Sequence, residues 1–332
     1  MESSHKKFQK IDLLCIFVLV CICSWILFSV ITRKKIDDIF PSKHIDIICP
    51  FSAGGGTDLL CRTIADSMSQ EFKVPVNVQN ITGGGGALGH TRGVEVSPDG
   101  YTLTMITFEL ITLSQRGFAP IKIDDFDYVA RLNADAACVA VNKDFPADTF
   151  EDFLKLAKSK KLKAGNSGVG SVWHLASELF SKKANIEMSC VAFDGASNAI
   201  TAMLGKHIDL VTVSAAELKA HVESGKVKIL AVMADKRISY LPNVPTCKER
   251  GVDVSFCTWR GITLPKNVPQ KNKDILQKTI AKILASKKMR EFSNDTGIDI
   301  EYCDGENFKE KIIEQYYQIK PLMIELGLMK EK

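Results

Sequence analysis

Two glycine-rich segments are the strongest candidates for chemistry in this chain. Residues 50–58 read PFSAGGGTD and residues 80–90 read NITGGGGALGH, and each stands between an expected strand and an expected helix. Glycine lets the backbone approach a ligand closely, so we expect Gly55 to need either a positive φ or that close approach. Free N–H groups at a helix start can bind an anion without lysine or arginine, and Asp58 could cap the first segment. One such segment also fits a tight turn, so the hypothesis of an anion pocket rests on the pair.

An enzymatic use of the second segment finds little support. Residues 84–89, GGGALG, match the Gly-x-Gly-x-x-Gly pattern of dinucleotide-binding turns. However, no acidic residue stands about twenty positions later, near Thr104, and Glu109 is the nearest. The chain has no Gly-x-Ser-x-Gly elbow, no Cys-x-x-Cys pair and no histidine cluster at metal spacing. We therefore expect no catalysis, no cofactor and no metal.

The elements that must position these segments follow from hydrophobic periodicity. Leu60, Ile64 and Met68 recur at helical spacing, which predicts an amphipathic helix over residues 58–72. The length of the chain suits two lobes, and helical patterns separate most of the short β-type runs, so we expect parallel sheets in both lobes. Loops at the carboxyl ends of the strands should then face each other across a cleft. The strands are predicted at residues 45–49, 74–80, 101–106, 138–142, 162–166, 189–193, 209–213 and 227–233.

Composition and charge bound the class of protein. The chain has 332 residues, 45% of them hydrophobic and 25% charged, which suits two globular domains. Residues 1–35 hold six basic and two acidic residues, so they account for the whole formal net charge of +4. Of the 43 basic and 39 acidic residues in the chain, 37 of each lie after residue 35. This neutral remainder argues against nucleic-acid binding.

The N-terminal region contains an uncharged apolar run at residues 13–31, LLCIFVLVCICSWILFSVI. A helix of this length, at about 1.5 Å rise per residue, approaches the ~30 Å hydrocarbon core of a bilayer. An uncleaved membrane anchor and a cleaved secretory signal both stay open, and either one exports the rest of the chain. Cys21 and Cys23 invite a lipid-anchor interpretation, but Val20 and Ile22 precede them where a small residue would be needed. The seven cysteines beyond the run are interpreted as small core residues.

The glycine-rich segments resemble those of a known family, the Bug-type substrate-binding receptors of tripartite tricarboxylate transporters. Further motifs, in the family's order, extend the resemblance over nearly the whole exported chain. They are SPDGYTL at residues 97–103, GNSGVGSVWHLASELF at 165–180, residues 191–195 followed by GKHIDL at 205–210, and LPNVPTCKERGVDVSFCTWRGITLP at 241–265.

The resemblance implies a type II periplasmic-binding-protein fold, with two α/β lobes, a ligand cleft and a hinge. Lobe one is expected at residues 43–142 and 256–332, lobe two at 143–255, and the signal or anchor at 1–35. The implied protein is a monomeric extracytoplasmic receptor that captures a small organic carboxylate, such as a di- or tricarboxylate, for the membrane subunits of a transporter. An extracellular carboxylate sensor for a signalling partner stays open, because both uses need the same ligand-driven closure.

The resemblance also nominates ligand contacts on both lobes. Those of lobe one are Phe51, Ser52, Ala53, Gly54, Asp58, Gly85, Gly86, Ala87, Thr107 and Phe108, and those of lobe two are Ser167, Gly168, Ser171, His174 and Asp194.

Some of these positions also fit a purely structural role. His174 could cap or pack at a helix start, and Phe108 could be a core aromatic. Trp259 and Arg260 are interpreted as residues that link the lobes. Two departures from the family pattern weaken the transfer: Ser52 stands where a smaller residue is frequent, and residues 193–194, Phe-Asp, replace a more usual Tyr-Lys pair. The second departure removes a positive charge from the mouth of lobe two.

Overall fold

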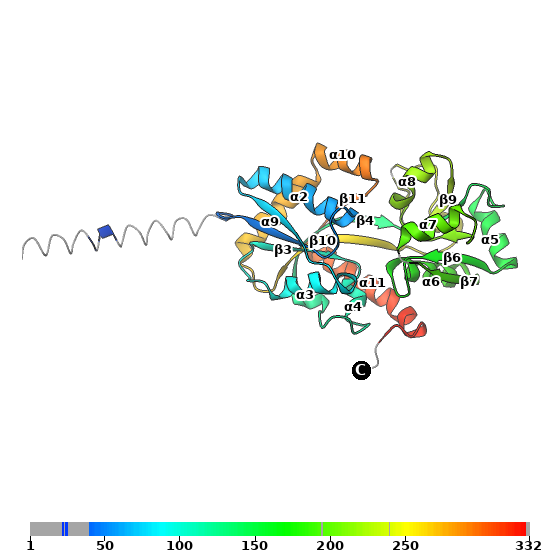
Figure 1. Ribbon diagram of the computed structural model, residues 1–332, viewed down its shortest axis with the longest axis horizontal. Coiled ribbons are helices and arrows are strands. Elements are labelled where there is room, and N and C mark those ends of the chain that lie inside the picture. Colours follow the sequence, from blue (N-terminus) through cyan, green and yellow to red (C-terminus); the bar gives the residue numbers. More distant parts are fainter. Residues whose placement is uncertain (1–21, 23, 26–39, 194, 239, 330–332) are drawn as a thin grey trace, which may run out of the picture. The chain divides into compact units, whose positions relative to one another are not determined.

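The computed structural model describes residues 22, 24–25, 40–193, 195–238 and 240–329 (Figure 1). The chain forms two units, Met1–His44 and Ile45–Lys332, and the second unit carries all the strands and the helices discussed below. Most of the apolar run and Asp194 lie outside the described residues. Within the described part, no helix has both the length and the apolar character needed to cross a membrane.

The first sheet of the unit Ile45–Lys332 has six strands in the order β11-β4-β10-β3-β1-β2. The strand β1 pairs in parallel with β2 and β3, whereas β10 pairs antiparallel with β3 and β4, and β11 antiparallel with β4. The strands are β1 (Ile45–Cys49), β2 (Val76–Asn80), β3 (Thr102–Thr107), β4 (Phe126–Ala136), β10 (Cys257–Pro265) and β11 (Ile300–Asp304).

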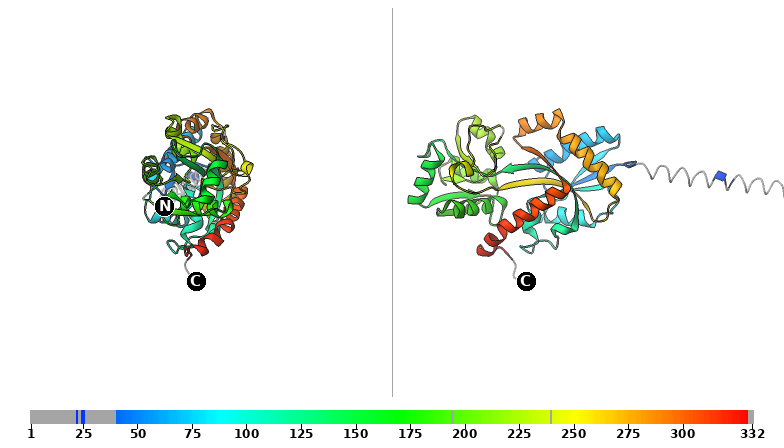
Figure 2. Two further views of the ribbon diagram at one scale, coloured as in Figure 1. Left: turned by 90° about the vertical axis from the view of Figure 1, so that its right-hand side faces the viewer. Right: turned by 180° about the vertical axis from the view of Figure 1, so that it is seen from behind.

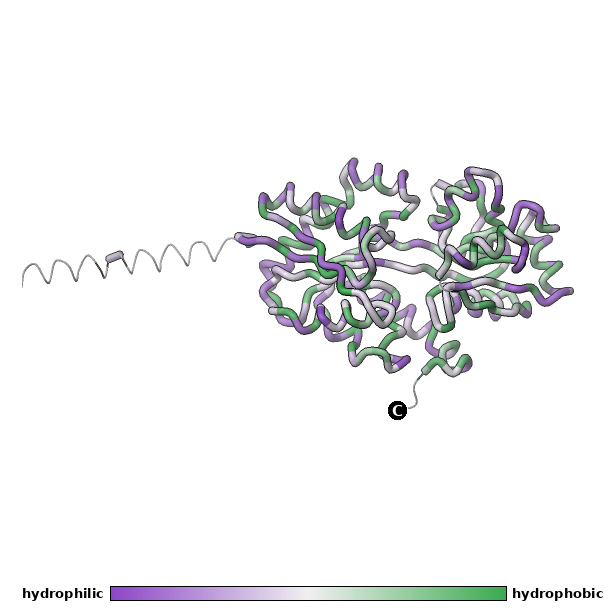
Figure 3. The backbone as a smooth tube through the Cα atoms, viewed as in Figure 1, coloured by the Kyte–Doolittle hydropathy of each residue, from purple (hydrophilic) through white to green (hydrophobic). Residues whose placement is uncertain are grey.

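Helices of the same unit accompany this sheet. They are α2 (Gly56–Phe72), α3 (Ala87–Glu95), α4 (Leu110–Leu113), α9 (Gln270–Leu284), α10 (Lys287–Thr296) and α11 (Gly305–Glu325), with the short 3-10 turns η1 (Gly84–Gly86) and η2 (Ile123–Asp125). Leu60, Ile64 and Met68 of α2 are fully buried. In Figure 3 hydrophilic and hydrophobic residues alternate along the helices, as they do in helices with one buried face.

The second sheet has five strands in the order β7-β6-β8-β5-β9. The strand β6 pairs in parallel with β7 and β8, and β5 pairs antiparallel with β8 and β9. The strands are β5 (Cys138–Asn142), β6 (Leu162–Asn166), β7 (Met188–Ala192), β8 (Leu210–Val211) and β9 (Val227–Val232), and the helical elements are α5 (Phe150–Ser159), α6 (Val172–Ala184), α7 (Ala196–Leu204), α8 (Ala215–Glu223) and η3 (Lys248–Arg250).

Two neighbouring strands carry the chain between the sheets. Only Ala137 separates β4 from β5, and β10 runs back antiparallel to β4, from the pair Cys257↔Ala136 to the pair Pro265↔Phe126. The helix α11 lies along these crossing strands when the molecule is seen from behind (Figure 2). Gln315 of α11 accepts a hydrogen bond from the Trp259 indole at 2.7 Å and donates one to the Cys257 carbonyl at 2.8 Å.

The predicted fold class, two α/β lobes of the periplasmic-binding type, is confirmed by two mixed α/β sheets. The expectation of parallel sheets is wrong in part. In each sheet, the strand that follows a crossing from the other sheet is antiparallel to its neighbours. This strand is β10 beside β3 in the first sheet and β5 beside β9 in the second. All seven cysteines of the described part are free thiols, and four of them are buried, namely Cys49, Cys61, Cys138 and Cys247. The residue boundaries of the lobes stay predictions.

Candidate functional site

A cavity of about 460 Å³ lies where the carboxyl ends of strands from the two sheets meet. From the first sheet come the segments after β1 and β3 and part of β10. From the second sheet come the starts of α6 and α8, which follow β6 and β8. The lining residues are Phe51, Gly56, Thr57, Leu59, Thr107, Glu109, Asp135, Val172, Trp173, Ser214, Ala216, Glu217, Thr258, Trp259, Arg260, Thr296 and Ile298.

The first glycine-rich segment is organised by the Asp58 carboxylate. Its Oδ2 accepts hydrogen bonds from the Gly54 N–H at 2.8 Å and the Arg62 Nε at 2.9 Å, and its Oδ1 accepts one from the Asn80 side chain at 2.8 Å. The same Asn80 amide donates to the Phe51 carbonyl at 2.9 Å. Burial alone would raise the pKa of Asp58, but these hydrogen bonds outweigh it and hold the pKa at about 2. Asp58 therefore shapes the loop as a charged carboxylate.

The backbone of this segment corrects one expectation. Gly54 has φ +83°, where a side chain would strain the backbone, whereas Gly55 has φ −78° and ψ 166° in the extended region. A Cβ on Gly55 would meet only the Ser52 carbonyl oxygen, at 3.6 Å. The positive φ therefore belongs to Gly54. A Cβ on Gly56 would make ordinary contacts, at 3.7 Å, with the Arg260 Nη2 and the Ile298 Cδ1.

The second glycine-rich segment depends on four consecutive glycines, residues 83–86, which all have positive φ. The fully buried His90 side chain contacts Gly86, the last of these glycines. The His90 Nδ1–H donates to the Gly86 carbonyl at 2.7 Å, and Nε2 accepts from the Thr107 N–H at 3.2 Å. Burial lowers the pKa of His90 to about 4, so the ring is neutral near pH 7. His90 thus links this segment to the end of β3.

The nominated first-lobe residues occupy three kinds of position. Phe51 and Thr107 line the cavity. Ser52, Ala53, Gly54 and Gly85 are exposed on the loops beside it, while Asp58, Gly86 and Ala87 are buried beneath these loops. Phe108 is only 1% exposed and packs against Phe256 and Trp259, with ring centroids 5.5 and 6.5 Å away. Its ring belongs to the core and does not line the cavity.

The nominated second-lobe residues lie on the turn before α6, next to the lining residues Val172 and Trp173. The Ser171 hydroxyl caps α6 by accepting the His174 N–H, and the Ser167 hydroxyl donates to Ser171 at 2.9 Å. His174 is buried and its Nδ1 accepts the Gly170 N–H at 3.1 Å. Neither Ser167, Gly168, Ser171 nor His174 lines the cavity.

His174 also belongs to a cluster that the sequence did not signal, together with Glu178 and Cys190. One ligand atom from each of the three lies within 4.8 Å of the others. However, His174 Nδ1 accepts a backbone N–H, so Nε2 carries the ring proton and faces Glu178 Oε1 at 3.6 Å. A metal at Nε2 would have to displace that proton. The neighbouring His174 ring lowers the pKa of Glu178, and the cluster brings α6 next to β7.

The charged side chains of the cavity come from both sheets. The Arg260 Nη1 contacts the Asp135 Oδ2 at 3.0 Å, and its Nε donates to the Thr57 hydroxyl at 2.9 Å. Glu109 follows β3, and Glu217 caps α8 together with Ser214. Burial in the cavity, with Asp135 nearby, raises the pKa of Glu217, although the hydrogen bonds from Ser214 and the Arg260 charge act in the opposite direction. Arg260 faces the cavity as well as linking elements of the fold.

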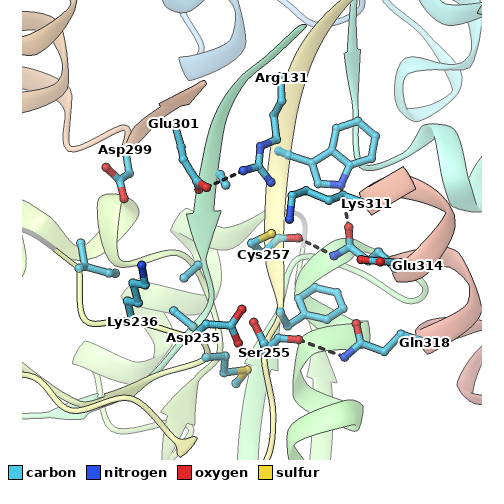
Figure 4. A pocket seen from close by; sticks show the side chains of 18 of the residues that line it. Arg131, Asp235, Lys236, Ser255, Cys257, Asp299, Glu301, Lys311, Glu314 and Gln318 are labelled. Carbon is cyan, nitrogen blue, oxygen red and sulfur yellow. Dashed lines mark hydrogen bonds and ion pairs between the residues drawn. The ribbon is translucent and has the colours of Figure 1, made fainter. Parts of the chain in front are cut away.

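A second cavity, of about 730 Å³, lies among β4, β10, β11 and α11 (Figure 4). Ala134 and Ala136 of β4 line it, whereas Asp135 between them lines the first cavity, so the two cavities occupy opposite faces of the crossing strands. Burial, with Asp135 and Glu301 nearby, raises the pKa of Asp299 here to about 6. Arg131 pairs with Glu301 at 2.6 Å. No glycine is among the described residues that line this second cavity, so the first cavity is the better candidate site.

A family model described as the tripartite tricarboxylate transporter family receptor, TctC, matches residues 60–328. The chain belongs to this receptor family. A relative in Cupriavidus necator, a UPF0065 protein in the gbd 5' region, is 29% identical over 301 residues, which cover 88% of this chain and 90% of the relative.

Solved structures agree with this membership. A TctC solute-binding protein from Polaromonas, solved without ligand, is 36% identical with a TM-score of 0.80, and the match covers 86% of this receptor and 100% of that chain. A protein of R. palustris solved with adipate is 23% identical with a TM-score of 0.75, over 87% of this receptor and 99% of that chain, and it shows the same fold. The resemblance seen in the motifs is therefore confirmed, and the family is one of extracytoplasmic solute-binding receptors, not a class of enzymes.

Several residues of this receptor's site were not among the nominated contacts. Thr57, Glu109, Glu217 and Arg260 line the cavity, and His90 orients the second loop. Arg260 stands opposite Thr107 in the β10–β3 register, although the two residues are 153 positions apart in the sequence. No local signal in the sequence predicts such a pairing.

Proposed function

We propose that this receptor captures a small organic carboxylate outside the cytoplasm and delivers it to the membrane subunits of a tripartite transporter. One observation carries the proposal. The start of α2, with Gly56 and Thr57, and the Arg260 guanidinium meet in a cavity between the carboxyl ends of two sheets. Helix-start N–H groups and a guanidinium are both suited to a carboxylate. The adipate seen in the R. palustris protein agrees with this class of ligand.

Within this proposal the carboxylate lies against the α2 start. The Nε and Nη1 groups of Arg260 already have partners, but no hydrogen bond of its Nη2 is present among the described residues. That group and the N–H groups near Gly56 are the donors left for the ligand. The exposed loop residues Ser52, Ala53, Gly54 and Gly85, together with Ser167 and Gly168, would reach the ligand when the two sheets approach each other.

A thermal-shift screen of the full-length receptor in detergent, against organic acids and matched uncharged amides, tests the proposal. An acid present at ~100 times its dissociation constant should add ~2.7 kcal/mol to the free energy of unfolding, while its amide should not. If no acid in a broad panel of mono-, di- and tricarboxylates and amino acids stabilises the receptor, the proposed function is wrong.

We also propose that residues 13–31 attach the receptor to the membrane, because this run is apolar, uncharged and flanked by basic residues. The full-length chain should sediment with membranes of its native cell, and a chain starting at Lys43 should be soluble and monomeric. Recovery of the full-length chain in the soluble cytoplasmic fraction would contradict this part of the proposal.

A further inference from the structure

The cavity between the sheets holds more acidic than basic side chains, which bears on the charge of the ligand itself. Among the described lining residues, Arg260 is the one cation, and the acids are Glu109, Asp135 and Glu217. A receptor for a dicarboxylate or tricarboxylate would be expected to offer more positive than negative charge to its ligand.

The charges of Asp135 and Arg260 compensate each other in an ion pair. Their contact is 3.0 Å long and the Asp135 side chain is only 5% exposed. Asp135 also accepts hydrogen bonds from the Asn133 side chain at 2.9 Å and the Asp299 N–H at 3.0 Å. Its carboxylate is therefore fully used within the protein, and it contributes little to the recognition of a ligand.

Glu109 and Glu217 each use only one carboxylate oxygen within the described part of the protein. Glu109 accepts a hydrogen bond from the Thr107 hydroxyl at Oε2, and no hydrogen bond of its Oε1 is present among the described residues. Glu217 likewise uses only Oε2, which accepts from the Ser214 N–H and hydroxyl. No lysine or arginine of the described part forms an ion pair with either glutamate. Each therefore keeps one carboxylate oxygen for a donor that comes with the ligand.

The second cavity shows that this imbalance is particular to the first. There Arg131 pairs with Glu301 (Figure 4), and Lys248 pairs with Asp235 at 2.7 Å. Lys236 and Lys311 also line that space, so its acids have cations within reach. In the first cavity, by contrast, Glu109 belongs to the first sheet and Glu217 to the second. Neither forms an ion pair with a lysine or arginine of the described part.

Resting on the proposed function, we propose that the ligand is a zwitterion, an amino-substituted carboxylate. Its carboxylate lies at the α2 start beside Arg260, and its ammonium group donates hydrogen bonds to Glu109, with Glu217 joining from the second sheet. Hydrogen bonds between ionised groups are the strong ones, and an ammonium group would offset the excess of acidic over basic side chains in this cavity. The apolar lining residues Leu59, Val172 and Ile298 leave room for an apolar side chain on the ligand.

The test uses pairs of acids that share a carbon skeleton and differ in an ammonium group against a hydroxyl group. The pairs are L-leucine with L-2-hydroxy-4-methylpentanoate, L-alanine with L-lactate, and L-aspartate with L-malate. Their dissociation constants are measured by calorimetry on the full-length receptor. In the best-binding pair the amino acid should bind at least tenfold more tightly than the hydroxy acid.

The variant Glu109→Gln keeps the shape of the side chain and removes its charge. It should reduce the preference for the amino acid at least tenfold while changing the affinity for the hydroxy acid less than threefold. Glu109→Asp, which keeps the charge, should retain part of the preference. Glu95→Gln is the matched control, because Glu95 is exposed on α3 and pairs with Arg92 outside the cavity.

The outcomes separate the inference from the function on which it rests. If hydroxy acids or plain dicarboxylates bind better than their amino counterparts, or if Glu109→Gln leaves the preference unchanged, the zwitterion inference is wrong and carboxylate capture stands. If no acid of either kind binds, both are wrong.

Discussion

The two glycine-rich segments each follow a strand of the first sheet and precede a helix, but different interactions hold their backbones in place. In the first, the Asp58 carboxylate holds the loop through hydrogen bonds with Gly54, Arg62 and Asn80. In the second, four glycines have positive φ, and no charged side chain of the described part hydrogen-bonds to them. The shape of the first loop therefore depends on a charge, and that of the second on the absence of side chains.

This difference predicts which substitutions each segment tolerates. A Cβ at Gly86 would lie 3.0 Å from the His90 ring and 3.4 Å from the Phe51 ring, at φ +95°. Gly86→Ala should therefore lower the free energy of unfolding by roughly 3 kcal/mol, from backbone strain and overpacking together. Urea denaturation measures the loss.

Gly85→Ala is the matched control for strain alone, because Gly85 has φ +64° but no atom within 4 Å of its Cβ position. Its expected cost is about 1 kcal/mol. Equal losses for the two variants would mean that contact with His90 does not hold the second segment.

The second segment should also respond to acid through His90. Its pKa is about 4 in the folded protein and 6.5 ordinarily, so between these values the unfolded chain binds a proton that the folded protein does not. Stability should therefore fall as the pH drops from 6.5 to 4, by roughly 3 kcal/mol from this group. The readout is the urea midpoint as a function of pH.

His90→Gln should flatten this pH dependence even if it lowers stability at pH 7. His207→Gln, at an exposed position, should leave the dependence intact. An unchanged slope in His90→Gln would exclude His90 as its source.

The first segment should respond to loss of charge. Asp58→Ala removes the acceptor of three hydrogen bonds and should lower the free energy of unfolding by about 2 kcal/mol. It should also weaken binding of the acid, although electrostatics alone predicts tighter binding once a negative charge near the site is gone. Asp66→Ala, on the outer face of the same helix, is the charge-matched control and should change neither property by more than ~1 kcal/mol. Tighter binding by Asp58→Ala would contradict the role of this carboxylate in shaping the loop.

The sequence predicts elements well where the signal is local. The buried run at residues 45–49 is the strand β1, and the helical spacing of Leu60, Ile64 and Met68 marks α2. By contrast β4, with charged residues in FDYVARLNADA, and the crossing strand β10 have no local pattern that shows their mixed pairing. Strand direction is set by where the chain enters a sheet, which periodicity does not encode.

The candidate site divides in the same way. Glycine-rich loops before helices are visible in the sequence, but which of three adjacent glycines has the positive φ is not. The structure assigns it to Gly54, and Gly55 is extended. Two acids of the cavity, Glu109 and Glu217, belong to different sheets and line one space only in the folded protein, so local patterns could not find them.

The central claim is that a carboxylate lies against the start of α2, beside Arg260. Gly56→Val tests it most directly, because the added Cβ would make only ordinary contacts, at 3.7 Å, while the side chain fills the space in front of Arg260 Nη2. Calorimetry with the acid that gives the largest thermal shift should show at least tenfold weaker binding, ~1.4 kcal/mol, at an unchanged unfolding midpoint. Binding as tight as that of the unmodified receptor would contradict the claim.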